Sequence, residues 1–298
     1  MKSINGVESM ILGRAIPLFM EWIKVKGMRE ETLRGYKMDV NQFQKWVSAK
    51  SNGSVFVDEL QLSDVEGFVS YLSNERECKP RTINRKINAL STFFRFLKKK
   101  KLVAENPLED FERVKVPQLE RIYLDRDEIE ALIKGIKHPV IRYFAMMMAH
   151  TGIRVNECIQ LTLKEVDLKE GYIQVINGKG GKNRRIPMNE QLIHHMKQYL
   201  KMYRPDTDSL LFFALKKTGT VSQQYVNHLL KEACKAVGIE KHITSHILRH
   251  SFASYLVKKD THVAIIQRLL GHADVRTTSV YMHVHQDDLQ EAVNQIDF

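Results

Sequence analysis

The stretch TSHILRHSFASYL, residues 244–256, has the spacing of one amphipathic helix with an unusual polar face. His246, Arg249 and His250 lie at positions i, i+3 and i+4, so a helix would place all three on one side. Apolar residues such as Phe252 form a stripe of the kind that packs into a protein interior. Two imidazoles and a guanidinium beside such a stripe indicate a surface with a chemical task.

The length and composition of the chain suit two domains. Its 298 residues exceed one ordinary domain, and 43% hydrophobic with 27% charged residues is typical of a globular protein. No window approaches eighteen consecutive apolar residues, and the start lacks the layout of a signal peptide, so we expect a cytoplasmic protein without a membrane partner. The distant Cys78, Cys158 and Cys234 predict reduced thiols.

Positive charge is spread over both halves of the chain. The formal net charge is +11, with 21 Lys and Arg against 15 Asp and Glu in residues 1–118 and 25 against 20 in residues 119–298. A polyanion held from two sides explains a basic excess in both halves. From charge alone, a nucleic-acid partner and a basic protein without one remain equally open.

The first hundred residues show helical periodicity. Residues 10–26 and 32–49 carry apolar residues at helical spacing, and Ser63 has the character of an N-cap for a helix that ends at Asn74. A fourth helix, KPRTINRKINALSTFFRFLKKKK, begins at Pro80 and ends in a cationic run.

On the fourth helix, Arg81, Arg85 and Lys86 share one face, which suits contact with the phosphates of a nucleic acid. The alternative is that this basic face is merely solvated.

Two prolines and mixed charge in residues 104–118 indicate an extended linker between domains of residues 1–103 and 119–298. In the second domain, Asp125 and Glu128 have capping-box spacing before a helix, and the helix in PVIRYFAMMMAHTG is expected to end at Gly152. The stretch VDLKEGYIQVINGKGGKNRRIPM alternates and breaks at glycines, which predicts a small antiparallel sheet. The fold class is therefore mainly α, of the α+β type.

Two segments resemble a phosphate-binding loop and a zinc site, but neither matches its motif. GKGGKN lacks the spacing of a phosphate-binding P-loop, and Lys182 is followed by Asn183 instead of Ser or Thr. His246 and His250 have the spacing of two zinc ligands, but Ile247 stands where a metalloprotease has Glu, and Arg249 would place positive charge beside the metal. Paired carboxylates for a two-metal nuclease are not evident, so we favour a mechanism without a metal.

What remains is a set of cationic and hydrogen-bonding residues beside sharp turns. Such groups are suited to surround a phosphate that gains negative charge. Each alone has a structural alternative, such as a surface ion pair, a solvated lysine, a capping histidine or a packed tyrosine. The set comprises Arg154, Lys179, His246, Arg249, His272 and Tyr281.

The motifs HTGIRVNE, GKGGKNRRIPM, HILRHSFAS, LLGH and TTSVYMHV occur in the order and spacing of the tyrosine recombinase (phage integrase) family. The resemblance extends in detail from Tyr123 to the end of the chain, and the length is similar to that of Xer-type members. It implies a four-helix core-binding domain followed by a catalytic domain with the DNA breaking-rejoining enzyme fold. It also implies site-specific recombination of duplex DNA.

The resemblance implies a role for each residue of the set. Tyr281 would attack a DNA phosphodiester to give a 3′-phosphotyrosine, and His246 would assist as a base. Arg154 and Arg249 would hold the non-bridging oxygens, Lys179 would protonate the leaving 5′-oxygen, and His272 would donate a hydrogen bond. Glu157 and His250 would support the site. Neither ATP, a metal nor another cofactor is required.

The resemblance also implies a homotetramer on two DNA sites that passes through a Holliday junction, with a second recombinase as an alternative partner. An amphipathic tail helix at about residues 286–296 would dock on a neighbouring protomer; alternatively, it folds back on its own domain. A type IB topoisomerase, a telomere resolvase and a DNA-binding regulator without catalysis are the other functions considered.

Overall fold

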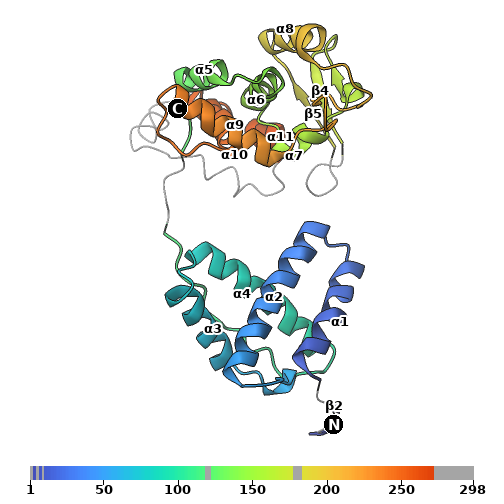
Figure 1. Ribbon diagram of the computed structural model, residues 1–298, viewed down its shortest axis with the longest axis vertical. Helices are drawn as coiled ribbons and strands as arrows, with labels where there is room; N and C mark the ends of the chain where they lie inside the picture. The colour runs from blue at the N-terminus through green and yellow to red at the C-terminus, as the bar shows by residue number, and fades with distance from the viewer. Residues whose placement is uncertain (1–2, 5–6, 9, 118–121, 177–182, 272–298) are drawn as a thin grey trace, which may run out of the picture. The chain divides into compact units, whose positions relative to one another are not determined.

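The computed structural model describes residues 3–4, 7–8, 10–117, 122–176 and 183–271. The chain divides into two compact units, Met1–Leu119 and Glu120–Phe298 (Figure 1). Each unit has its own hydrophobic core. Within the described residues, no helix combines the length and the apolar character needed to cross a membrane.

The first unit contains the four predicted helices. These are α1 (Leu12–Val25), α2 (Glu30–Lys50), α3 (Leu62–Asn74) and α4 (Pro80–Lys99), with a 3₁₀ turn at Val57–Glu59. Two short antiparallel strands, β1 (Ser3–Ile4) and β2 (Val7–Glu8), were not predicted.

The start of α3 differs from the prediction. The N-cap is Gln61, two residues before Ser63, and the Asp64 carboxylate accepts a hydrogen bond of 3.0 Å from the Gln61 backbone N–H. The prediction that Ser63 caps this helix is therefore wrong. An acidic side chain in the first turn satisfies the backbone donor that precedes the helix, so the helix begins earlier.

Aromatic side chains form the centre of the first unit. Phe19 of α1 contacts Phe93 of α4 with ring centroids 5.2 Å apart, and Phe43 of α2 contacts Phe68 of α3 at 5.3 Å. Both pairs meet edge to face, and all four rings are fully buried. This geometry adds an electrostatic attraction to the hydrophobic gain. Phe43 also contacts Phe94 of α4 at 6.4 Å, so the four helices share one core.

The segment after α4 is non-helical, as expected of a linker, but its first part packs on the first unit. Leu108 is buried in the aromatic core, and Phe111 packs against it. Asn84 of α4 donates a hydrogen bond of 2.7 Å to the backbone oxygen of Val114 and accepts one of 3.0 Å from its backbone N–H. The chain is thus fastened to α4 as far as Val114.

The second unit begins with the predicted capping box. The carboxylates of Asp125 and Glu128 each accept a hydrogen bond of 2.9 Å from the other residue's backbone N–H, at the start of α5 (Arg126–Gly135). Just before it, the backbone N–H of Leu124 donates to the Ser251 hydroxyl at 2.8 Å. This bond connects the entry of the unit to a helix far along the sequence.

The central helix of the second unit is α6 (Pro139–Thr151), whose side chains are buried along most of its length. It packs against α10 (Ser245–Lys258), the helix of the opening motif. Gly152 ends α6 with a φ of +61°, as predicted. A Cβ there would lie 2.4 Å from Phe252, so close approach of α10 also requires glycine.

The predicted antiparallel sheet has three strands in the order β3 (Val166–Asp167), β4 (Tyr172–Val175) and β5 (Arg184–Pro187). Val175 pairs with Arg184, and Ile173 pairs with the buried Ile186. The turn between β4 and β5 lies outside the described residues. In Figure 1 the sheet and α8 lie at one end of this unit, and α5 lies at the other.

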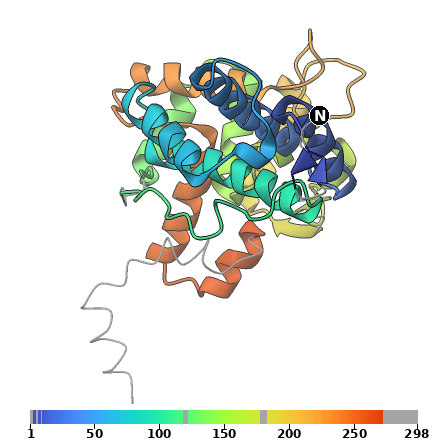
Figure 2. The ribbon, with the colours of Figure 1, turned by 90° about the horizontal axis from the view of Figure 1, so that it is seen from below.

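Helices complete the unit. They are α7 (Val155–Gln160), a 3₁₀ turn at Leu163–Glu165, α8 (Glu190–Gln198), a π-helical turn at Tyr199–Tyr203, α9 (Gln223–Ala236) and α11 (Val263–Leu270). Helices α10 and α11 lie side by side, and Figure 2 shows them in orange to red. Their packing places the end of α11 near the end of α6.

Candidate active site

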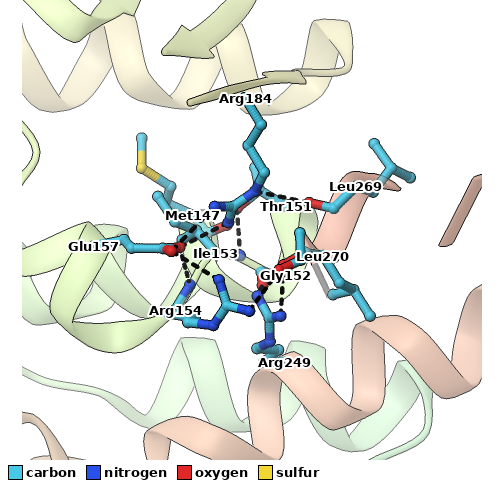
Figure 3. Close-up of polar contacts among 11 residues, drawn as sticks. Met147, Thr151, Gly152, Ile153, Arg154, Glu157, Arg184, Arg249, Leu269 and Leu270 are labelled. Atoms are coloured by element: carbon cyan, nitrogen blue, oxygen red, sulfur yellow. Dashed lines mark hydrogen bonds and ion pairs between the residues drawn. The ribbon is translucent and has the colours of Figure 1, made fainter. Parts of the chain in front are cut away.

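The ends of α6 and α11 meet and are bound by guanidinium groups (Figure 3). The Arg249 side chain donates one hydrogen bond to the backbone oxygen of Gly152 and another, of 2.7 Å, to that of Leu270. Arg154 donates through Nη2 to the oxygen of Gly271 at 2.8 Å. Carbonyls at helix ends lack intrahelical donors and carry partial negative charge, so they attract cations.

The two arginines reach this place from different elements. Arg154 is the N-cap of α7, two residues after the glycine that ends α6, and its side chain is 21% exposed. Arg249 lies in the second turn of α10 and is buried, with 5% exposure. The guanidinium groups nevertheless converge on consecutive carbonyls, those of Leu270 and Gly271.

A carboxylate in α7 binds Arg154 and a further arginine. Glu157 accepts a bond of 2.8 Å from Arg154 Nη1 and one of 3.1 Å from the Arg154 backbone N–H. Both its oxygens also bind Arg184 of β5, at 3.0 Å from Nη1 and 2.7 Å from Nη2. One carboxylate thus joins α7 to the sheet.

Burial alone would raise the pKa of Glu157, but the hydrogen bonds and charge of Arg184, with a further contribution from Arg154, lower it to about 2. The carboxylate is therefore ionised throughout the physiological range. Two guanidinium groups face one carboxylate, so net positive charge remains at this place.

The polar face of α10 is divided between solvent and interior. His246 is exposed in the first turn, and His250 is half-buried one turn later. Partial desolvation and the neighbouring positive charge of Arg249 lower the pKa of His246 below its ordinary value. The neutral imidazole is therefore favoured at neutral pH, and it can accept a proton.

Three of the six predicted residues lie outside the described residues. Lys179 belongs to the segment between β4 and β5, His272 directly follows Gly271, and Tyr281 lies further toward the C-terminus. Among the residues that the structure describes, no three His, Cys, Asp or Glu side chains are grouped as metal ligands would be.

The basic face of α4 is only partly available to a ligand. Arg81 is exposed, whereas Arg85 pairs with the buried carboxylate of Asp39 on α2, with one bond at 2.9 Å. Lys86 is buried and donates at 3.0 Å to Asp39 and at 2.6 Å to Gln42. The expectation that Lys86 lies along phosphates is therefore corrected, because its ammonium is enclosed within the unit.

Arg184 is the residue of this site that the sequence analysis missed. Along β5, side chains alternate between the two faces, so Arg184 shares the inward face with the buried Ile186. A basic residue at an inward position of a strand signals a buried partner, and period-two alternation would have revealed it.

Known proteins resemble the chain over both units. The sequence profile of the Phage integrase family matches residues 123–287, and that of the phage integrase N-terminal SAM-like domain matches residues 17–103. The tyrosine recombinase XerD of Listeria innocua is 32% identical over 280 residues, which cover 91% of this chain and 93% of that protein. A tyrosine recombinase of Thermosipho africanus is 29% identical, with 96% and 100% covered.

Among solved structures, the Tn1549 transposon integrase in complex with transposon right end DNA has a TM-score of 0.79 at 19% identity, covering 94% of this chain and 98% of that one. This likeness confirms the predicted fold. The profiles and the relatives confirm the predicted resemblance, Xer type included. The chain belongs to the phage integrase family and is a tyrosine recombinase, an enzyme of site-specific DNA recombination.

Proposed function

We propose that this recombinase cleaves and rejoins duplex DNA at a specific site through a 3′-phosphotyrosine intermediate on Tyr281. The observation that carries the proposal is the convergence of Arg154 and Arg249 on the carbonyls of Gly271 and Leu270, directly before His272 in the sequence. Guanidinium groups with fixed geometry suit the oxygens of a phosphate that acquires charge during attack.

In the first step, the phenolic oxygen of Tyr281 attacks phosphorus while the bond to the 5′-oxygen breaks. A phenol has an ordinary pKa of about 10, so it needs a proton acceptor. His246 takes that proton, which its lowered pKa allows. Lys179 donates a proton to the leaving 5′-oxygen, and His272 donates a hydrogen bond to the phosphate.

In the second step, which reverses the first, a 5′-hydroxyl from another strand attacks the phosphotyrosine and gives its proton to Lys179. The bond from phosphorus to the Tyr281 oxygen breaks, and His246 returns a proton to that oxygen, so Tyr281 leaves as a phenol. The covalent bond to the enzyme conserves the energy of the phosphodiester, so religation requires neither ATP nor a metal.

Glu157 and His250 support the site without reacting. Arg81 and Arg85 contact DNA phosphates outside the active site. The reaction takes place in the cytoplasm.

The test is covalent trapping on a nicked duplex taken from DNA that flanks the gene. Cleavage releases a short 5′-hydroxyl fragment, so the adduct accumulates and is detected on a denaturing gel. The wild type should form adducts and Tyr281→Phe should form none, although both bind the duplex in a mobility-shift assay. Adducts of Tyr281→Phe at the wild-type level would show that another residue is the nucleophile.

We further propose that four protomers assemble on two DNA sites and exchange strands through a Holliday junction. The support is the amphipathic pattern of Leu289, Val293 and Ile296 in the tail, whose structure lies outside the described residues. Such a stripe suits docking on a neighbouring protomer.

Truncation after Val284 should weaken assembly on paired sites more than binding to a single site, because the exchanged helix is lost. Native gels with one-site and two-site DNA measure both. Weaker single-site binding with intact pairing would instead indicate a tail that folds back on its own domain.

A further inference from the structure

Arg184 lies at the junction of three segments of the second unit. It begins β5, and its guanidinium binds both oxygens of Glu157 in α7. Its Nε donates at 3.2 Å to the backbone oxygen of Leu269 at the end of α11. Its side chain is 10% exposed, so these contacts are largely shielded from water.

The same two segments hold Arg154. The guanidinium of Arg154 binds Glu157 Oε1 through Nη1 and the oxygen of Gly271 through Nη2. Arg184 orients the plane of the Glu157 carboxylate with a two-pronged bond. A Cβ at Gly271 would lie 2.9–3.1 Å from Arg184 Cδ, Nε and Cζ. Arg184 therefore also packs against Gly271, the residue whose carbonyl holds Arg154.

Arg154 depends on Arg184 through charge as well as through geometry. Glu157 is 11% exposed and ionised, so it requires a positive partner inside the protein. With Arg184 present, its charge neutralises the carboxylate, and the charge of Arg154 remains for a ligand. Without Arg184, Arg154 alone would compensate Glu157, and less of its charge would act on a phosphate.

We propose that Arg184 is a positioning residue that aligns the guanidinium of Arg154 with the reacting phosphate, through the Glu157 carboxylate and the Leu269–Gly271 backbone. The inference rests on the proposed function. It assigns Arg184 an effect on the non-bridging oxygens of the phosphate and none on the departure of the 5′-oxygen.

The experiment measures single-turnover adduct formation at saturating protein by Arg184→Gln on three DNAs. One has the ordinary phosphate, one a methylphosphonate in place of a non-bridging oxygen, and one a sulfur in place of the bridging 5′-oxygen. Methylphosphonate lacks the negative charge that a guanidinium stabilises. Sulfur is a better leaving group, because a thiol has a pKa of about 8.5.

We expect Arg184→Gln to lower the rate on ordinary phosphate about 10- to 100-fold, by analogy with the loss of part of one charge-stabilising contact. Its DNA affinity should remain within threefold of the wild type. The deficit should shrink at least tenfold, or disappear, on methylphosphonate, as for Arg154→Ala, and should persist on the 5′-sulfur DNA. Arg185→Gln, which removes the same charge from the exposed face of β5, should react within twofold of the wild type.

Wild-type rates for Arg184→Gln, a deficit that persists on methylphosphonate, or recovery on the 5′-sulfur DNA would each overturn the inference. If circular dichroism shows that Arg184→Gln is unfolded, Arg184→Lys decides, because it keeps the charge but loses the two-pronged bond. Its rate on ordinary phosphate should be lowered less than that of Arg184→Gln. The lowering should again shrink on methylphosphonate and persist on the 5′-sulfur DNA. Adducts formed by the wild type and not by Tyr281→Phe establish the proposed function separately, so these outcomes concern Arg184 alone.

Discussion

The guanidinium groups of Arg154 and Arg249 have two functions in this site. Each binds a backbone carbonyl at the end of α11, and each adds positive charge beside that helix end. An arginine has five N–H donors in a rigid plane. Arg154 uses its two terminal nitrogens on Glu157 and Gly271 and keeps 21% of its side chain exposed. A lysine has one nitrogen and could not span both contacts in this way.

Glu157 should make the stability of the chain depend on pH. Its folded-state pKa of about 2 lies below the ordinary 4.5, so its stabilising effect is complete above the ordinary value and is lost as the pH falls toward 2. A depression of this size corresponds to about 3 kcal/mol. The measurement is urea unfolding of the wild type and Glu157→Gln between pH 7 and pH 2.5.

The difference between the two proteins should narrow steadily below about pH 4.5. Glu170→Gln, which removes an exposed carboxylate, controls for the loss of charge. A difference that stays constant with pH would mean that the Glu157 pKa is not depressed.

At the scale of elements, most helices could be predicted from sequence because their apolar periodicity is strong and their ends carry local signals. The capping box at Asp125 and the stop at Gly152 are of this kind. The π-helical turn after α8 was not predicted, because it depends on packing. The start of α3 was predicted two residues too late, because Ser63 is a common capping residue and the bond between the Asp64 carboxylate and the Gln61 backbone N–H was not recognised.

In the site, too, residue types could be predicted from the sequence, whereas contacts between distant segments could not. The residue types of Arg154 and Arg249 could be selected from their motifs, but the burial of Arg249 could not, because its two carbonyl partners come from helices distant in sequence. The sequence indicates a surface at His246 and Arg249 of α10, which is right for the exposed His246 and wrong for the buried Arg249. Lys86 likewise pairs with a residue 47 positions away.

The turn after α6 should tolerate no side chain. Gly152→Ala combines a left-handed backbone, which costs about 1–2 kcal/mol, with contacts to Phe252 and Leu270 that cost about 1–3 kcal/mol more. Urea unfolding should show the loss, and adduct formation should fall because the Gly152 carbonyl binds Arg249.

The control is Gly238→Ala, which has a similar φ of +73° but no atom within 4 Å of the added Cβ. It should cost only about 1 kcal/mol and leave adduct formation unchanged. Equal losses for the two variants would show that crowding at Gly152 contributes nothing.

At the scale of the whole molecule, positive charge is divided between both halves, at +6 and +5. If both bind one duplex, several phosphates are neutralised together and counterions are released. Affinity for duplex DNA should then fall about 10³-fold or more between 50 and 200 mM salt, as expected for at least six phosphate contacts.

Fluorescence anisotropy with labelled duplex measures this slope. The thermal transition of the protein alone, recorded over the same range, shows whether salt acts on folding instead. A change in affinity below tenfold at constant stability would mean that few phosphates are contacted.

The fastening of Val114 to Asn84 limits how far the two halves can separate. Among the described residues, the next backbone group held by the second unit is the oxygen of Tyr123, nine residues later, which accepts a hydrogen bond from Lys241. Nine residues span at most about 30–32 Å. Such a short tether confines the second half near any duplex that the first has captured, at an effective concentration in the millimolar range. Release from DNA would then require both halves to dissociate at the same time, so the residence time of the chain on DNA should exceed that of either half alone.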